Sequence, residues 1–488
     1  MSSNSTFHSM NKKSIGLLLG PALFFIIYYM PLPEGMLPEA QAVLAGTVWI
    51  AAWWITEAVP IPVTSLLPVV IFPMTGALSL SETTSAYGNP IVFLFMGGFI
   101  IALSMEKWNL HKRIALTTVL HIGTNPVKVV LGFMIATGFL SMWISNTATA
   151  MMMMPIALAV TKQYSDLGVA ANTSPLFGKA LMLGIAYAAS IGGLATLVGT
   201  PANAIFVGVA QQGMGTIVSF FDYMKFAFPL SCILLIICWL YLTKVAYPLN
   251  SESVYGSVLD TIQAELKVLG KISSEEKRIG AVFILIACCW TTRTFLLNKI
   301  FPALDDSMIA IIGAIALFII PNSSKANKET LLTWEIGKKM PWGILLLFGG
   351  GLSIATGFET SGLSTWIGRQ MMLLSNIPDF FIILAIVASI NFLTEITSNT
   401  ATATMMLPIM AALATATGIH PYATMLAACL ASSCAFILPV ATPPNAIVFG
   451  SGYFTMKEMA SKGFWLNIIT TIIISIYIHY LLPPLWGI

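Results

Sequence analysis

Two short polar triplets interrupt long apolar stretches of this chain. FLSMWISNTATAMMMMPIALAV, at 139–160, contains a Ser-Asn-Thr triplet at 145–147, and FLTEITSNTATATMMLPIMAAL, at 392–413, contains a second at 398–400. Residues of these types cap helices, so the helix that follows each triplet would begin there, with free N–H groups and the positive end of its dipole exposed. Each triplet therefore predicts a polar pocket that attracts an anion.

Proline breaks two further apolar stretches near their centres. A Gly-Thr-Pro triplet lies at 199–201 and an Ala-Thr-Pro triplet at 441–443, with Pro444 next. Proline lacks the backbone donor that a helix needs, so it interrupts the helix and frees carbonyl groups. Carbonyls freed inside a membrane suit a bare monovalent cation such as sodium. Two breaks and two triplets together predict two symmetry-related cation sites.

Neither Ser-Asn-Thr segment contains Lys or Arg. A doubly charged anion at the centre of a bilayer would be costly without a counter-charge. Bound cations are the available substitute, so we expect cation and anion to be transported together.

The composition places the chain in a membrane. Its 488 residues are 57% hydrophobic and only 9% charged, whereas soluble domains carry about 25% charged residues. Apolar stretches long enough for a span, roughly 20 residues, recur along the whole chain. We expect an all-α polytopic protein with about eleven transmembrane helices and two re-entrant hairpins. The net charge of +3 is small and the basic residues lie in short loops, which argues against nucleic acid as a partner.

An internal repeat links the two halves. The triplet segments superpose at an offset of 253, and the same offset places Gly97 on Gly350 and Leu110 on Leu363. LVGTPANAI at 197–205 matches PVATPPNAI at 439–447 at an offset of 242. An odd number of predicted crossings separates equivalent points, so the two halves are expected to be inverted. Inverted repeats are common in secondary transporters, which bind substrate at the repeat interface near the membrane midplane.

The triplets are expected at the tips of hairpins that enter and leave the membrane by one face. Lys128 and Lys162 bound 33 residues without a charge or a histidine, too many for one span and too few for two. Their arithmetic midpoint is Ser145. In the second copy, Asp379 and His420 bound a stretch whose only charge is Glu395. Non-helical backbone at this depth is tolerated where it lines a cavity or is buried in protein.

The predicted organisation follows from these boundaries. A cytoplasmic amino terminus and first transmembrane helix (1–39) precede repeat 1 (40–248), a cytoplasmic linker (249–274) and repeat 2 (275–488). The re-entrant hairpins are expected at 126–162 and 378–418, and the broken helices at 180–210 and 422–450. The positive-inside rule favours a cytoplasmic amino terminus and an external carboxyl terminus. Of the 23 Lys and Arg residues, this orientation places only Lys225, Arg293, Lys299 and Arg369 outside.

These motifs resemble the divalent-anion/sodium symporter (DASS) family, which includes the INDY-type dicarboxylate transporters. The resemblance runs from WITEAVPIPVTSLLPV at 54–70 to ATPPNAIVFGSG at 441–452. It implies sodium-driven uptake of four-carbon dicarboxylates such as succinate, malate and fumarate. It also implies a homodimer in the bacterial inner membrane whose transport domain moves against a scaffold in an elevator mechanism, with sodium as coupling ion and no other cofactor.

The resemblance also assigns site residues. The first sodium site would use Ser141, Ser145, Asn146 and Gly199, and the second Thr394, Thr397, Asn399 and Ala441. The dicarboxylate would be bound by Asn146, Thr147, Ser398, Asn399, Thr400 and Pro443.

Other interpretations remain open. A sodium-independent dicarboxylate or citrate exchanger could share this fold, and a channel or a membrane enzyme could use the same cavity. The sequence shows no nucleophile and base set, so we expect no enzymatic activity. Glu395 lies beside the second tip; it is expected either to act in transport or to hold the hairpin in place.

Overall fold

The computed structural model describes residues 4–122, 125–166, 173–215, 218–249, 257–323 and 329–487. Within these ranges the regular secondary structure is helical, apart from a single isolated β-bridge between Pro321 and Thr330. This confirms the predicted all-α class, and helices suit a lipid-embedded chain because they satisfy backbone donors internally. Within the same ranges, 7 helical segments are long and apolar enough to cross a membrane, and further apolar helices are shorter, with 10–17 residues. The number of spans stays a prediction.

The first half of the chain ends with the long helix α12 and the π-helical turn that continues it. Its elements are α1 (Asn4–Tyr29), α2 (Pro38–Thr56), α3 (Ile61–Thr64), α4 (Leu67–Thr75), α5 (Leu80–Ser85), η1 (Ala86–Gly88), α6 (Pro90–Lys107), α7 (Leu110–Ile122), α8 (Pro126–Ser141), α9 (Asn146–Asp166), α10 (Thr173–Gly193), α11 (Pro201–Met214), α12 (Phe220–Leu240) and η2 (Tyr241–Ala246).

The second half ends with the longest helix of the described chain, α24. Its elements are α13 (Ser257–Leu269), α14 (Ser274–Thr292), η3 (Arg293–Leu297), α15 (Asn298–Ile300), α16 (Asp306–Ile319), α17 (Trp334–Gly337), α18 (Trp342–Thr360), α19 (Leu363–Gln370), η4 (Met372–Asn376), α20 (Asp379–Leu393), α21 (Asn399–Thr417), α22 (Pro421–Ser432), α23 (Pro443–Phe449) and α24 (Met456–Trp486).

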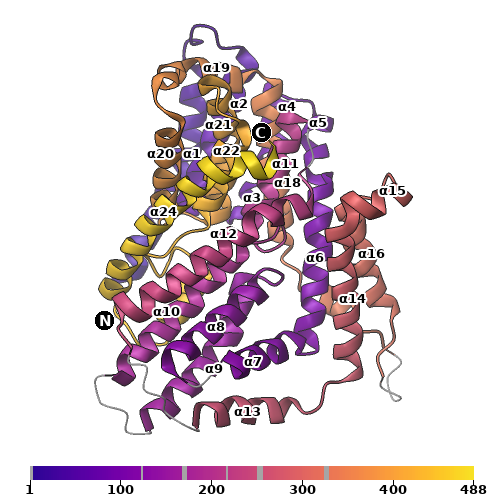
Figure 1. The fold of residues 1–488 in the computed structure, drawn as a ribbon. Coiled ribbons are helices and arrows are strands. Elements are labelled where there is room, and N and C mark those ends of the chain that lie inside the picture. Colours follow the sequence, from indigo (N-terminus) through magenta and orange to yellow (C-terminus); the bar gives the residue numbers. More distant parts are fainter. Residues whose placement is uncertain are drawn as a thin grey trace.

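Each Ser-Asn-Thr triplet lies where a turn meets the second helix of a hairpin, with its serine in the turn and its asparagine and threonine at the start of the helix. Residues 142–145 join α8 to α9, and residues 394–398 join α20 to α21. The pair α8 and α9 occupies the lower half of Figure 1, and α20 and α21 occupy the upper half. The two proline triplets also separate helices, α10 from α11 and α22 from α23. Whether the two hairpins are re-entrant, and whether the halves are inverted across a membrane, stay predictions.

The helix before the first break starts earlier than the sequence boundary at 180. α10 begins at Thr173, and Lys179 lies inside it, with its ammonium nitrogen 2.5 Å from Glu458 Oε1 of α24. Lysine is a good helix former, and the ion pair with α24 gives its charge a partner. The helix therefore extends to the amino-terminal side of residue 180.

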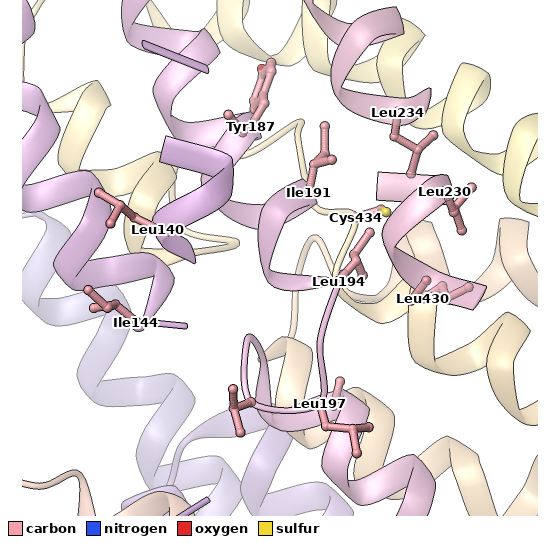
Figure 2. Packing of buried hydrophobic residues seen from close by; sticks show 14 of the residues in the cluster. Leu140, Ile144, Tyr187, Ile191, Leu194, Leu197, Leu230, Leu234, Leu430 and Cys434 are labelled. Atoms are coloured by element: carbon pink, nitrogen blue, oxygen red, sulfur yellow. The ribbon is translucent and has the colours of Figure 1, made fainter. Parts of the chain in front are cut away.

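The end of α10 is fixed by apolar packing on two sides. Tyr187, Ile191 and Leu194 lie between Leu140 of α8 and Leu230 of α12, as Figure 2 shows. None of these five side chains is more than 1% exposed. Closely packed interiors leave little freedom to shift, so the start of the first break is held rigidly.

The predicted linker at 249–274 contains the helix α13. In Figure 1 this helix crosses the lower end of the molecule below α7 and α9. An ion pair between Lys112 and Glu265, at 2.8 Å, attaches this segment to α7, and Arg113 of α7 pairs at 2.6 Å with Glu276, in the first turn of α14. Arg113 also donates to the carbonyl of Gly270. The connection between the two halves is therefore docked against the protein.

Candidate functional site: a cavity between the two tips

One cavity of about 850 Å³ brings both tips and both breaks together. This volume lies in the range typical of small-molecule sites, about 300–1,000 Å³. The tips contribute Ser145, Asn146, Thr147 and residues 395–400; the breaks contribute 198–201, 440–444 and Ala446; and the remaining wall comprises Lys13, Trp54, Ile55, Thr56, Glu57, Ile61, Phe95, Phe99 and Ile344. Segments more than 250 residues apart in sequence thus share one cavity.

At the first tip, a hydroxyl group orients an asparagine. Ser141 Oγ donates to Asn146 Oδ1 across 2.5 Å, and Ser141 is fully buried in the last turn of α8. Ser145 Oγ accepts from the amide of Ala148 at 3.2 Å, so it caps α9 as predicted. Asn146 is packed so closely against Gly193 that a Cβ atom there would lie 2.7 Å from Oδ1. A glycine is therefore required at the end of α10.

The second tip repeats this arrangement. Thr394 Oγ1 donates to Asn399 Oδ1 at 2.8 Å and also lies 2.7 Å from the carbonyl oxygen of Ser432. Thr397 Oγ1 and Thr402 Oγ1 are 2.5 Å apart. The expectation that the triplet serine caps the following helix is wrong here, because the Ser398 side chain makes no capping hydrogen bond to α21. Its hydroxyl lies in the cavity wall instead.

The two breaks are held open by equivalent asparagines. Asn203 Nδ2 donates to the carbonyls of Gly193 at 3.0 Å and Thr196 at 2.7 Å. Asn445 Nδ2 donates to the carbonyls of Ala435 and Leu438, both at 3.0 Å. Both asparagines are fully buried. They substitute for the intrahelical donors that proline removes.

Helix ends contribute to the electrostatics of the cavity, whose lining also contains the carboxylates of Glu57 and Glu395. α9, α11 and α21 begin at Asn146, Pro201 and Asn399, and all three residues line the cavity. The positive ends of three helix dipoles therefore meet there, which favours an anion. The described lining contains one basic side chain, Lys13 of α1, and none from either tip. This arrangement combines attraction for an anion with oxygen atoms that suit a cation.

The predicted site residues fall into two groups. Ten of the twelve line the cavity: Ser145, Asn146, Thr147, Gly199, Thr397, Ser398, Asn399, Thr400, Ala441 and Pro443. Ser141 and Thr394 do not line it. They lie behind the tips, where each hydroxyl binds the amide oxygen of an asparagine that does.

Comparison with known proteins identifies the family. The family described as "Sodium:sulfate symporter transmembrane region" matches residues 11–487. The chain belongs to this family.

Two bacterial relatives of this symporter family cover nearly the whole chain. One named sodium-dependent dicarboxylate transporter SdcS, from Staphylococcus saprophyticus, is 45% identical over 97% of this chain and 92% of its own length. A protein of the same name from Staphylococcus aureus is 46% identical over 99% of this chain and 95% of its own. The chain is thus a multi-pass membrane transporter and not an enzyme.

Two solved transporters share the fold of this symporter at low identity. The YdaH transporter of Alcanivorax borkumensis has a TM-score of 0.57 at 14% identity and covers 84% of this chain and 90% of its own. MtrF of Neisseria gonorrhoeae, described as an antimetabolite efflux pump, has a TM-score of 0.51 at 14% identity and covers 82% of this chain and 83% of its own. At this identity the likeness concerns the fold alone.

Glu395 holds the second break of the symporter in place. It is 3% exposed, and its carboxylate accepts three consecutive backbone amides, from Phe436 at 2.7 Å and from Ile437 and Leu438 at 3.0 Å. Asn467 Nδ2 adds a fourth donor at 2.8 Å. Amide donors compensate a buried carboxylate, so the positioning role expected of this residue has a clear geometry.

The opposite wall of the cavity was not foreseen from the sequence. Trp54, Ile55, Thr56 and Glu57 line it at the end of α2. Glu57 has a φ of 49°, which is unusual for a residue with a side chain. A sequence signal was present, since these residues open the WITEAVP segment, but the spacing alone did not indicate that this segment faces the tips.

Proposed function

We propose that this chain is a sodium-coupled symporter of four-carbon dicarboxylates such as succinate, malate and fumarate. Its relatives of 45% and 46% identity carry the name sodium-dependent dicarboxylate transporter. The dimensions and charge pattern of the cavity are consistent with such a substrate. A carboxylate at each end of a short chain can approach one tip each.

The observation that carries this proposal is the matched pair of asparagines. Asn146 and Asn399 both line the cavity, and each receives a hydrogen bond on Oδ1 from a hydroxyl five residues earlier. The Nδ2 group of each asparagine is then left as a donor for a carboxylate oxygen. With no basic side chain at either tip, bound sodium ions supply the positive charge that a dianion requires.

The sodium ligands proposed are those that the family resemblance assigns. Ser145, Asn146 and Gly199 would surround one ion, with Ser141 orienting Asn146 from behind. Thr397, Asn399 and Ala441 would surround the other, with Thr394 in the orienting position. The dicarboxylate would lie between Thr147 of one tip and the 398–400 segment of the other, against Pro443.

Transport requires that the cavity open alternately to the two sides, and one pair of residues supports this. Trp143 and Ile396 occupy equivalent positions before the two triplets. Ile396 is 66% exposed and lines the cavity, whereas Trp143 packs against Phe283 and Phe220. We propose that the two tips exchange these environments during transport. An elevator movement, a homodimer and a cytoplasmic amino terminus complete the proposal.

Transport assays on the purified protein test this function. In proteoliposomes that contain no dicarboxylate, an inward sodium gradient should drive accumulation of labelled succinate. An exchanger would instead need a dicarboxylate inside the vesicle, and a channel would show uptake that does not saturate with succinate concentration. Either of those results would contradict the proposal.

A further inference from the structure

A buried polar cluster lies outside the cavity, where α20 packs against α24. It consists of Asn391 of α20 and Asn467, Thr470 and Thr471 of α24. Asn391 and Asn467 are 0% exposed, and the two threonines are 1% and 5% exposed. Polar groups in the interior of a membrane protein are costly to bury and commonly serve function. This cluster therefore requires an explanation.

Three oxygen atoms of α24 surround the amide of Asn391. Asn391 Nδ2 lies 3.0 Å from Thr471 Oγ1, 3.4 Å from Thr470 Oγ1 and 3.2 Å from the main-chain oxygen of Asn467. Thr470 Oγ1 donates to that same main-chain oxygen at 3.1 Å. All three partners are acceptors, so they concentrate negative partial charge at one point.

Two further oxygen atoms of this cluster have no partner in the described part of the chain. They are Asn391 Oδ1 and Asn467 Oδ1, both fully buried. A buried polar atom without a hydrogen bond costs about 1–3 kcal/mol. Because the two ends of an amide have the same shape, rotation of Asn391 by 180° would place its oxygen beside the three acceptors. The cluster is thus rich in oxygen and short of donors.

The packing of two helices does not itself demand these polar groups. Ser219 and Thr455 are the N-caps of α12 and α24, which sets an offset of 236 between these helices. By this offset, Thr471 of α24 corresponds to Leu235 of α12. By the offset of 253 that relates the two hairpins, Asn391 of α20 corresponds to Gly138 of α8. A Cβ atom on Gly138 would lie 2.7 Å from Leu235 Cδ1. At this pair of positions the first half therefore makes the helix contact without polar groups.

The charge balance around Glu395 also favours a bound cation at this cluster. Asn467 links the cluster directly to Glu395 through the hydrogen bond from its Nδ2 group. Among the described residues, Glu395 forms no ion pair with a basic side chain. Two sodium ions at the tips would balance the two charges of the dicarboxylate, so the negative charge of Glu395, although stabilised by amide donors, would have no cation to neutralise it. A third cation next to Asn467 would compensate it.

We propose that Asn391, Asn467, Thr470 and Thr471 form a third sodium site, distinct from the two tips. The ligands are the Asn391 amide oxygen, the two threonine hydroxyls and an oxygen of Asn467. With the Asn391 amide turned so that its oxygen replaces Nδ2, that oxygen would lie about 3.0–3.4 Å from the other three, a spacing that fits ligands around an ion held at about 2.4 Å. Through Asn467 and Glu395, an ion at this site stabilises the break that carries Ala441. Its occupancy is thereby coupled to that of the second tip.

This proposal rests on the sodium-coupled function proposed above. A double variant that introduces the corresponding residues of the first half tests the third site. The double variant Asn391→Gly with Thr471→Leu reproduces the pair found at Gly138 and Leu235. Ser475→Ala is the matched control, because Ser475 is buried one turn further along α24 and donates to the Thr471 carbonyl. Equilibrium binding of radioactive sodium in saturating succinate, and the reversal potential of succinate flux in proteoliposomes, both give sodium ions per succinate.

We expect the double variant to bind one sodium ion fewer per succinate than the wild type, and Ser475→Ala to match the wild type. If the double variant does not fold, Thr471→Val replaces it in the test, because valine has the shape of threonine but no hydroxyl group. We expect this variant to raise the sodium concentration for half-maximal binding by about tenfold or more. An unchanged sodium count and an unchanged sodium affinity would overturn the third site and show that the cluster holds water or only orders two helices. Absence of sodium-dependent uptake by the wild type would instead contradict the proposed function.

Discussion

The Thr394 hydroxyl donates a 2.8 Å hydrogen bond to the amide oxygen of Asn399, five residues later. In the other half of the chain, Ser141 and Asn146 form the same bond. In each case the hydroxyl residue ends one helix of a hairpin or follows it directly, and the asparagine begins the next. A single local interaction therefore fixes the orientation of the amide at both tips.

We expect Asn146→Ala and Asn399→Ala each to abolish most sodium-dependent succinate uptake. Hydrogen bonds to charged groups contribute about 1.5–3 kcal/mol, which corresponds to a loss of about 10-fold to 150-fold in apparent affinity. Initial uptake rates in proteoliposomes measure the effect. Asn376→Ala, at an exposed asparagine outside the cavity, is the control. Normal uptake in both tip variants would refute the site assignment.

The orienting hydroxyls should affect sodium more than stability. Thr394→Val preserves side-chain shape but removes the hydrogen bonds to Asn399 and to the Ser432 carbonyl. We expect the sodium concentration for half-maximal uptake to rise by about fivefold to tenfold, since the single hydroxyl proton serves one acceptor at a time and a lost hydrogen bond costs about 1 kcal/mol. Thr417→Val, near the far end of α21, should leave it unchanged. An unchanged sodium dependence in Thr394→Val would exclude the orienting role.

Glu395→Gln should destabilise the second break. A glutamine side chain places an NH₂ group where the carboxylate accepts amides from residues 436–438, so at least one buried donor loses its acceptor. We expect a loss of about 3 kcal/mol or more, measured as a lower midpoint of thermal unfolding in detergent. Glu335→Gln is the control, because its exposed pair with Lys338 contributes little. Equal midpoints for the two variants would contradict the positioning role.

A cysteine at position 396 should report occupancy of the cavity. Ile396 is exposed and lines the cavity, so Ile396→Cys should react with a water-soluble thiol reagent once the exposed Cys232 and Cys288 are replaced by serine. We expect sodium and succinate together to slow the reaction severalfold, and each alone to have little effect. Met74→Cys, 82% exposed and outside the cavity lining, gives the control. Equal protection by succinate without sodium would contradict coupled binding.

Much of the fold and the site could be predicted because the local signals are strong. A proline or a Ser-Asn-Thr triplet within an apolar stretch marks a break wherever it lies. The repetition of both motifs at nearly constant offsets then indicates that the two breaks and the two tips belong together. The cavity does combine residues of the two tips, Asn146 and Asn399, with Gly199 and Ala441.

What the sequence could not provide depends on contacts between distant segments. The opposite cavity wall at Trp54 and Glu57, and the acceptance of three amides by Glu395, arise from tertiary packing. The capping expected of the triplet residues is confirmed for Ser145 and wrong for Ser398, since the repeat is approximate at the level of side chains. The polar cluster around Asn391 was missed for the same reason, because Asn391 and Thr471 correspond to Gly138 and Leu235 in the first half.

The most direct test of the account is the cation requirement of concentrative uptake. Purified transporter in proteoliposomes would receive labelled succinate with sodium, potassium or choline as the only external cation. The account predicts accumulation above the external concentration with sodium, and none with potassium or choline. Equal accumulation with all three cations would contradict the central claim that bound sodium ions replace the basic side chains absent from the two tips.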